Sequence, residues 1–251
     1  MEAVVAAVSA LESDALFNAG TGAKLQADGR ARLSASLMDG PTERFAGVIN
    51  VEGLLHPIQL ARHLLDDDAR VLDGEGALAR ARELGLQEGD VRTPQSIAEW
   101  EDARGAGTIG RGGTVGAVAL DSAGRLAAAT STGGRGMERP GRVSDSATPA
   151  GTFASPRAAV SCTGWGEQIL GGGLAVRVVQ SVEHGADAHT AAQGLLMHML
   201  DRDWQAGFIA LDADGTWSVA HTTPVMAWHI RAQDLDAGFL APPPPPRKPW
   251  E

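Results

Sequence analysis

Apolar residues recur every three or four positions in several stretches of the chain, a pattern typical of helices that bury one face. These stretches lie at residues 2–12, 57–65, 77–84, 167–183 and 188–200. Pro57 stands at the start of the second stretch, where a proline is tolerated because the first helical N–H needs no partner inside the helix. We expect a helix in each stretch.

Other segments alternate apolar and polar residues or form short β-branched runs, as strands do. They lie at residues 32–38, 45–51, 114–120, 126–130, 158–162, 208–211 and 216–220. Turn residues at 121–124 and 212–215 join two pairs of these segments into predicted hairpins. Strand pairs separated by helix pairs predict an α+β fold in which helices cover antiparallel sheets.

Three further segments are expected to be irregular. Residues 14–22 form a tight loop punctuated by glycine. Residues 87–113 are polar and end in a glycine-rich run, so we expect a flexible linker there. The proline-rich tail, residues 242–251, predicts an extended polyproline segment outside the core. A solvated tail is favoured over a ligand for a proline-reading groove.

Composition narrows the classes of partner. The chain has 251 residues, 43% of them hydrophobic, and a net charge of -10. This acidity argues against nucleic acid and against an anionic membrane, because both call for clustered Lys and Arg. Cys162 is the sole cysteine, so no internal disulfide forms and a reducing compartment is the simplest expectation. The first residues lack a basic region, and Ser9 interrupts their apolar run, so we expect a cytoplasmic protein without a signal peptide.

Thr114 is the residue with the most distinctive chemical context. It follows Gly113 at the end of the predicted linker and opens a predicted strand. A threonine hydroxyl is a poor nucleophile unless a base lies beside it, and the threonine's own α-amine can be that base. Thr114 would then need a free N-terminus, which requires cleavage after Gly113. The alternative is that Thr114 is simply a β-branched residue that starts a strand.

Four motifs follow one another from this point. They are GTVGAVALD (113–121), LAAATSTGG (126–134), PGRVSDS (140–146) and VSCTGWGE (160–167). Shorter matches precede them at residues 16–20, 35–40 and 74–76. Together they closely resemble the plant-type asparaginase or isoaspartyl peptidase family of N-terminal-nucleophile hydrolases, over about residues 2–230. Several motifs in the same order are far more specific than any one of them.

The resemblance implies a single domain, residues 1–251, built as a four-layer αββα sandwich. It also implies cleavage into an α part, residues 1–113, and a β part, residues 114–251, with two such pairs forming the active dimer. Relatives begin with an apolar strand that ends in His-Gly-Gly-Ala-Gly, whereas Met1 falls inside the helix that follows that strand. We therefore expect the sandwich to lack its first strand and the start of that helix.

The catalytic roles also come from the resemblance. The Thr114 hydroxyl is expected to attack the Gly113 carbonyl, and water then cleaves the resulting ester to free the α-amine. Thr132 is expected to orient the Thr114 hydroxyl. The Thr163 hydroxyl and the Gly164 N–H are expected to form the oxyanion hole. Residues 130–132 could otherwise be ordinary strand residues with satisfied hydroxyls.

The expected substrate is an aspartyl head group whose side-chain amide is cleaved. By resemblance, Arg142 holds its α-carboxylate, while Asp145 and the Gly166 carbonyl hold its α-ammonium. Asparagine, β-aspartyl dipeptides or both fit this description, and catalysis needs no cofactor. Arg142 and Asp145 could otherwise form a surface ion pair of little energetic weight.

Asn18 matches a family position near the active site. It lies in a loop whose backbone carbonyls bind sodium in relatives, so the resemblance implies a possible structural sodium. The matching residues are Leu11, Glu12, Asp14, Phe17, Ala19 and Thr21.

Other readings of the sequence remain open or are disfavoured. Cys162 is expected to be a small core residue, and the histidines lack the spacing of a zinc site. Residues 110–116 lack the Lys-Ser/Thr pair of a phosphate-binding loop. Ser144 stands where relatives usually have glycine. Within the enzyme class, a glycosylasparaginase is the main alternative to an isoaspartyl peptidase, and a threonine endopeptidase is less favoured. An unprocessed, inactive scaffold is the alternative outside that class.

Overall fold

The computed structural model describes residues 1–106 and 113–239. The helices are α1 (Glu2–Glu12), α2 (Pro57–Leu64), α3 (Gly74–Glu83), α4 (Pro94–Ala106), α5 (Gly166–Gly172), α6 (Leu174–Glu183) and α7 (Ala188–Leu200), with a 3-10 turn at Asp145–Ala147. The strands are β1 (Leu33–Asp39), β2 (Arg44–Val51), β3 (Val71–Asp73), β4 (Val115–Leu120), β5 (Leu126–Thr132), β6 (Thr152–Ala154), β7 (Ala158–Gly164), β8 (Ala206–Asp212), β9 (Trp217–His221), β10 (Trp228–Ala232) and β11 (Leu235–Phe239). The predicted α+β class is confirmed.

The first sheet has five strands in the order β3-β2-β1-β5-β4. Its neighbours are antiparallel except for β2 and β3, which are parallel. Helix α1 packs on β4 and β5, and α2 packs on β1 and β2. The apolar stripe of α1, including Val4 and Val8, lies in one buried cluster with Leu33 and Leu37 of β1. The apolar periodicity of residues 2–12 therefore corresponds to the helix face that packs on this sheet.

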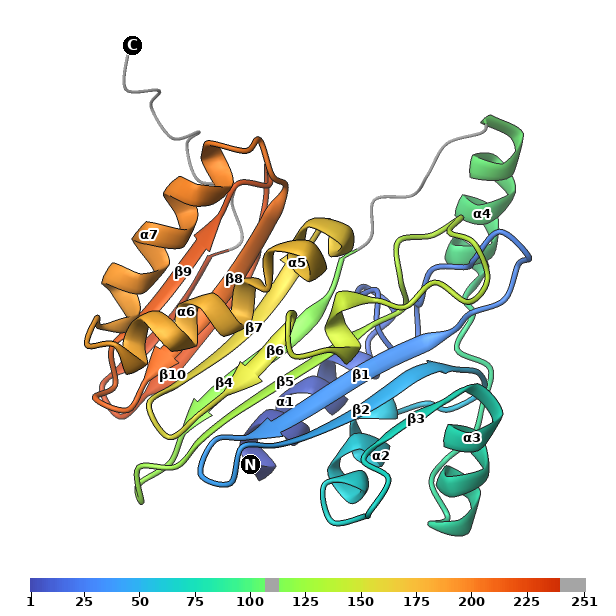
Figure 1. The fold of residues 1–251 in the computed structure, drawn as a ribbon. Coiled ribbons are helices and arrows are strands. Elements are labelled where there is room, and N and C mark those ends of the chain that lie inside the picture. The colour runs from blue at the N-terminus through green and yellow to red at the C-terminus, as the bar shows by residue number, and fades with distance from the viewer. Residues whose placement is uncertain (107–112, 240–251) are drawn as a thin grey trace.

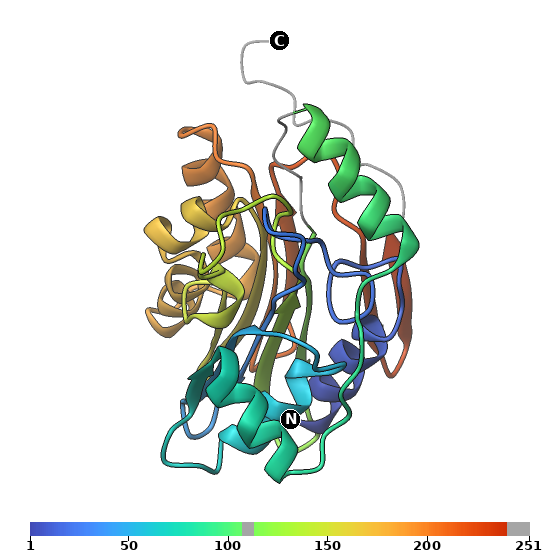
Figure 2. The same cartoon turned by 90° about the vertical axis from the view of Figure 1, so that its right-hand side faces the viewer.

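The second sheet has four strands in the order β6-β7-β8-β9 and is antiparallel throughout. Helices α6 and α7 pack on it, and Val178 and Val179 share a buried cluster with Phe208. Cys162 belongs to the same cluster, which confirms that it is a core residue. Figure 2 shows α6 and α7, in orange, on one side of the strands and α1, in blue, on the other.

The two sheets contact each other through β4, β5 and β7. Thr130 of β5 and Ser161 of β7 join their hydroxyls over 2.7 Å. Gly116 of β4 lies so close to Ser161 that a Cβ at Gly116 would collide with the serine hydroxyl. The start of β4 and the end of β7 lie at the same end of the sheets (Figure 1). Residues that lead into β4 and residues that follow β7 therefore lie near each other.

Two predicted segments differ from the structure. Residues 87–113 were expected to be irregular, but α4 occupies 94–106. This helix lacks an apolar stripe, so periodicity could not reveal it. It is held instead by reciprocal bonds between Thr93 and Ser96 and by the Trp100 indole N–H, which donates to the Gln26 carbonyl over 2.9 Å. The helical stretch 167–183 is two helices, because Gly173 adopts a left-handed φ of 58° between them.

Short and peripheral strands were not predicted from the sequence. Both β3 and β6 have three residues, too few for an alternating pattern to be recognised. The hairpin of β10 and β11 forms a separate two-stranded sheet. The proline-rich tail 242–251 and residues 107–112 of the expected linker lie outside the described residues. Across residues 1–106 and 113–239, the helices are too short or too polar to cross a membrane.

Candidate active site

Thr114 lies immediately before β4, at the point where the chain enters the five-stranded sheet. Val115 pairs with Ser131 of β5, so the antiparallel register sets Thr114 opposite Thr132. The Thr114 hydroxyl donates to Thr132 Oγ1 over 3.4 Å. Thr132 is only 2% exposed, which holds its hydroxyl in a fixed environment. The strand pairing therefore brings together the proposed nucleophile and the residue expected to orient it.

The Gly113 carbonyl is held by two hydrogen-bond donors. Asn18 Nδ2 donates to this oxygen over 2.8 Å, and Thr132 Oγ1 donates to it over 3.3 Å. Thr132 Oγ1 in turn accepts a hydrogen bond from the Gly134 N–H over 3.1 Å. Both donors polarise the carbonyl and can stabilise negative charge that develops on its oxygen. The Thr114 hydroxyl and the carbonyl it would attack thus share a neighbour in Thr132.

Asn18 is fixed on every side by backbone partners. Its Oδ1 accepts from the Lys24 N–H over 2.9 Å, and its Nδ2 donates to the Gly134 carbonyl over 2.5 Å. Its own carbonyl accepts from the Gly133 N–H over 2.9 Å. A Cβ at Gly133 would lie 2.6 Å from Asn18 Oδ1, so only glycine allows this approach. The loop after α1 and the turn after β5 therefore orient the amide together.

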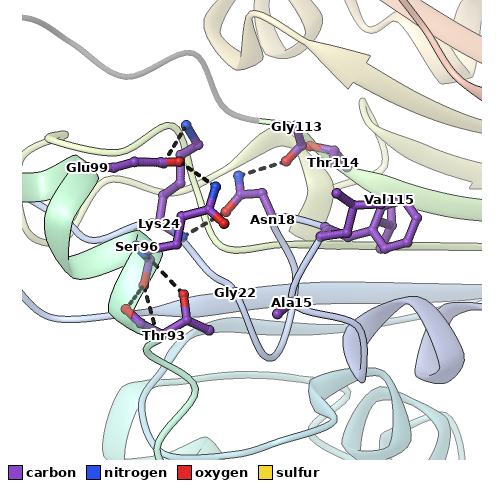
Figure 3. A pocket seen from close by; sticks show the side chains of 13 residues that line it. Ala15, Asn18, Gly22, Lys24, Thr93, Ser96, Glu99, Gly113, Thr114 and Val115 are labelled. Atoms are coloured by element: carbon purple, nitrogen blue, oxygen red, sulfur yellow. Dashed lines mark hydrogen bonds and ion pairs between the residues drawn. The ribbon is translucent and has the colours of Figure 1, made fainter.

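A pocket of about 300 Å³ opens beside this bond. Its lining includes Asn18, Lys24, Ser96, Glu99, Gly113 and Thr114. Figure 3 shows Asn18 between Lys24 and Gly113, with Glu99 reaching in from α4. Among the described residues, Thr163, Arg142 and Asp145 lie outside this lining. The pocket therefore does not include the residues expected to hold an aspartyl head group.

Arg142 is bound by Glu167, not by Asp145. Its Nε donates to Glu167 Oε1 over 2.7 Å, and a terminal nitrogen lies 3.4 Å from Oε2. Arg135 reaches the same carboxylate over 3.1 Å and stacks on the Trp165 ring at 4.6 Å. Partial burial disfavours ionised Glu167, but the hydrogen bond and the charges of the two arginines outweigh it and lower its pKa.

Asp145 is a buried acid, and its neighbours compensate only part of the cost of burying its negative charge. It is 3% exposed, and burial raises its pKa to about 6, although the positive charge of Arg142 and a hydrogen bond from Ser144 act against this. Its Oδ2 has no hydrogen-bond partner among the described residues. Arg142 and Asp145 Oδ1 both lie against Gly166, where a Cβ would collide with them. The surface ion pair considered from the sequence is wrong, since both side chains are largely buried.

Thr163 and Gly164 end strand β7. Gly164 has a φ of 128°, and a Cβ there would lie 2.5 Å from the Gln205 carbonyl oxygen. Glycine is therefore required at this position both by conformation and by space. The next residue, Trp165, donates its N–H to the same carbonyl over 2.7 Å. This fixes the turn that carries the chain from β7 into α5.

The loop matched to a sodium site is closed by the Thr21 N–H, which donates to the Glu12 carbonyl over 2.8 Å. The carbonyls of Leu11 and Asp14 also accept backbone N–H groups, whereas those of Phe17, Ala19 and Thr21 accept none among the backbone bonds between described residues. The Glu12 carboxylate accepts from Ser131 Oγ over 2.6 Å. The described residues contain no cluster of acidic, histidine or cysteine side chains able to hold a metal. Any ion here would depend on carbonyl oxygens.

Three residues of the site were not assigned a role from sequence. Glu167 was part of a quoted motif, and its place in the first turn of a helix could have indicated a fixed acidic group. Arg135 and Lys24 lie in irregular segments, where periodicity gives no signal. Tertiary contacts alone bring Arg135 to Glu167 and Lys24 to the pocket.

These contacts combine a threonine hydroxyl, a carbonyl held by two hydrogen-bond donors and a largely buried arginine paired with a carboxylate. Comparison with known proteins identifies the family of this chain, because the family model described as Asparaginase matches residues 1–239. An isoaspartyl peptidase/L-asparaginase from Synechocystis is 44% identical over 91% of this chain and 75% of its own length. A second, from Nostoc, is 43% identical over 89% of this chain and 76% of its own. A plant-type L-asparaginase from Pyrobaculum calidifontis is 37% identical over 90% and 81%. The chain belongs to the asparaginase family.

Proposed function

We propose that this protein is a self-processing threonine amidohydrolase that cleaves the side-chain amide of asparagine, the β-aspartyl bond of isoaspartyl dipeptides, or both. An asparaginase-type hydrolase activity is supported by its similarity to proteins named isoaspartyl peptidase/L-asparaginase. The observation that carries the finer proposal is the contact network of Thr114, Thr132, Asn18 and Gly113. In it, the Thr114 hydroxyl bonds to Thr132, and the adjoining Gly113 carbonyl has two donors that could stabilise the oxyanion of an acyl transfer.

The first proposed step is self-cleavage. Thr114 Oγ1 bonds to the Gly113 carbonyl carbon, and the oxyanion that forms is stabilised by Asn18 Nδ2 and Thr132 Oγ1. The Gly113–Thr114 C–N bond then breaks, and the hydroxyl proton passes to the Thr114 nitrogen as it becomes an amine. Water hydrolyses the resulting ester, which leaves a carboxylate on Gly113 and restores the Thr114 hydroxyl. Backbone strain at a residue without Cβ, such as Gly113, costs less than at other residues.

The second proposed step is turnover of substrate. The freed α-amine of Thr114, with an ordinary pKa of about 7.7 to 8.0, takes the proton of its own hydroxyl during attack on the substrate amide. It then donates this proton to the leaving nitrogen. The Thr163 hydroxyl and the Gly164 N–H stabilise the oxyanion, and water hydrolyses the aspartyl ester. Each such donor contributes about 2.7 to 4 kcal/mol of transition-state stabilisation.

The proposed head-group site consists of Arg142, Asp145 and the Gly166 carbonyl. Glu167 binds Arg142 through Nε and, at 3.4 Å, through Nη2, which leaves Nη1 and the second N–H of Nη2 to face a substrate carboxylate. A guanidinium suits this role because it binds carboxylates in a fork. Asp145 Oδ1 lies against Gly166 together with Arg142, which places negative and positive charge side by side for a zwitterionic head group.

We also propose the family's assembly for this chain. It comprises a four-layer αββα sandwich, an α part over residues 1–113, a β part over residues 114–251 and a dimer of such pairs. The loop from Leu11 to Thr21 is proposed to hold a structural sodium through its free carbonyls, those of Phe17, Ala19 and Thr21. A higher melting temperature in sodium chloride than in choline chloride would support the ion. Native mass spectrometry would report the assembly.

Intact-mass analysis tests the central proposal. Purified protein should convert with time into two chains separated between Gly113 and Thr114, and the processed enzyme should release aspartate from asparagine or from β-aspartyl-leucine. Thr114→Ala should remain one chain and should hydrolyse neither substrate. A wild-type protein that stays intact after long incubation would exclude the mechanism and favour an inactive scaffold.

A further inference from the structure

Lys24 brings a positive charge into the pocket beside the Gly113–Thr114 bond. Its side chain is 27% exposed, and its Nζ lies 3.6 Å from Glu99 of α4. Its backbone N–H is bonded to Asn18, whose amide is bonded in turn to Gly113. Figure 3 shows Lys24 and Glu99 facing each other at one side of Asn18. The backbone of Lys24 is thus linked through Asn18 to Gly113, and its ammonium lies in the pocket that Gly113 and Thr114 also line.

The proposed chemistry of Thr114 indicates which part of a substrate this pocket would hold. In turnover, the proton accepted by the Thr114 α-amine goes to the leaving nitrogen, so the leaving group must lie on the side of that amine. In the uncleaved chain, this side is occupied by Gly113, which is bonded to the same nitrogen. Gly113 lines the pocket together with Lys24, whereas the head-group residues Arg142 and Asp145 lie outside the lining among the described residues.

The two substrate classes differ in the leaving group that would occupy this pocket. Asparagine releases ammonia, which needs no subsite. A β-aspartyl dipeptide releases an amino acid whose own α-carboxylate is free and carries a negative charge. A flexible, partly exposed ammonium beside the leaving-group side is a suitable partner for that carboxylate.

We propose that the pocket lined by Lys24 and Glu99 is the leaving-group subsite for β-aspartyl dipeptides, in which Lys24 binds the free α-carboxylate of the departing amino acid. This inference rests on the proposed function and assigns it a substrate preference. Glu99 pairs with Lys24 over 3.6 Å and competes with the carboxylate for it. Dipeptides that end in a free carboxylate are favoured over isoaspartyl peptides in which that group is amidated or extended.

The test compares two substrates that differ only in this group, β-aspartyl-leucine and β-aspartyl-leucinamide. With processed wild-type enzyme, KM should be lower for the free acid than for the amide. Lys24→Met should raise KM for the acid about tenfold and remove the difference between the two substrates. Lys24→Arg should restore the preference, and Glu99→Gln should lower KM for the acid.

Arg30→Met is the matched control, because it removes one positive charge from an arginine whose side chain is 63% exposed and which pairs with Glu52. Arg30 does not line the pocket, so its loss should leave the acid-to-amide ratio at the wild-type value. An unchanged ratio in Lys24→Met would overturn the inference, as would an equal rise in KM for both substrates. If wild-type enzyme hydrolysed neither these substrates nor asparagine, the proposed function itself would fail.

Discussion

Asn18 donates its side-chain amide to the carbonyl oxygen of Gly113 over 2.8 Å, across 95 positions of sequence. The bond joins the loop after α1 to the residue that precedes the proposed nucleophile. Because the same amide also contacts the backbone of Gly134 and Lys24, the donor cannot turn away. Asn18 is therefore placed to act on the proposed self-cleavage, a role that its position near the active site did not specify.

Asn18→Asp should slow self-cleavage about 100- to 1000-fold. The substitution keeps the shape of the side chain and the acceptor for Lys24, but it removes the donor and places negative charge beside the developing oxyanion. The rate is measured as the fraction of intact chain over time by mass spectrometry. Cleavage at the wild-type rate by a variant with a wild-type circular dichroism spectrum would contradict this role.

Glu167→Gln should raise KM for asparagine roughly three- to tenfold and change kcat little. Glu167 fixes the Nε side of Arg142 and also binds Arg135, so its charge orients the guanidinium that is proposed to hold the substrate carboxylate. A glutamine offers one acceptor and no charge, and Arg142 becomes free to move. Steady-state kinetics of the processed enzyme give the two constants separately.

The control for this experiment is Glu83→Gln. Glu83 also pairs with an arginine, Arg80, over 2.9 Å, but its side chain is 65% exposed and it lies on α3. Its removal should leave both constants unchanged. A fall in KM for Glu167→Gln would show that the carboxylate blocks Arg142 instead of orienting it.

Sequence predicted the helices and strands that carry a regular apolar face. Residues 188–200 are an example, because α7 covers the range predicted from its periodicity. Helix α4 could not be found in this way, since its stability depends on Trp100 reaching Gln26 and on the Thr93–Ser96 pair. These are tertiary and capping contacts that leave no period in the sequence.

For the same reason, only part of the site could be predicted from the sequence. The turn residues 121–124 predicted the β4–β5 hairpin, and the register observed in the structure sets Thr114 opposite Thr132. The partner of Arg142 could not be predicted from the sequence. Asp145 is nearer to Arg142 along the chain, but Glu167 is the residue that binds the Arg142 side chain. Close spacing indicates possible neighbours, whereas the turn from β7 into α5 decides which carboxylate reaches the guanidinium.

Asp145 should make the folded protein less stable as pH rises through about 6. Burial raises its folded pKa to about 6 from 3.8, so the folded state holds the proton more tightly than the unfolded state does. Its contribution to stability is full below pH 3.8 and is lost above pH 6. Between pH 5 and pH 8 the loss is on the order of 1 kcal/mol.

Asp145→Asn should abolish this pH dependence, which is measured by urea unfolding at the two pH values. Both proteins should carry Thr114→Ala, so that each is a single chain and unfolding is unimolecular. The stability gain of Asp145→Asn should be larger at pH 8 than at pH 5 by an amount on the order of 1 kcal/mol. An equal gain at both pH values would show that Asp145 titrates normally.

Gly116→Ala should destabilise the protein by about 1 to 3 kcal/mol, because the added Cβ would collide with the Ser161 hydroxyl between the two sheets. Ser161 cannot simply turn away, since its hydroxyl is bonded to Thr130 over 2.7 Å. The collision would also shift the start of β4, two residues after Thr114, so self-cleavage should slow. Urea unfolding in the Thr114→Ala background gives the stability, and intact mass in the native background gives the cleavage rate.

Combining Gly116→Ala with Ser161→Gly tests whether this contact is the cause. The double variant should lose less stability than the sum of the single variants, by about 1 kcal/mol or more, since the serine that collides is gone. Gly76→Ala is the control: a Cβ there meets nothing within 4 Å, and the residue lies in α3, where alanine is favoured over glycine. Additive losses would place the cost of Gly116→Ala outside the contact of the two sheets.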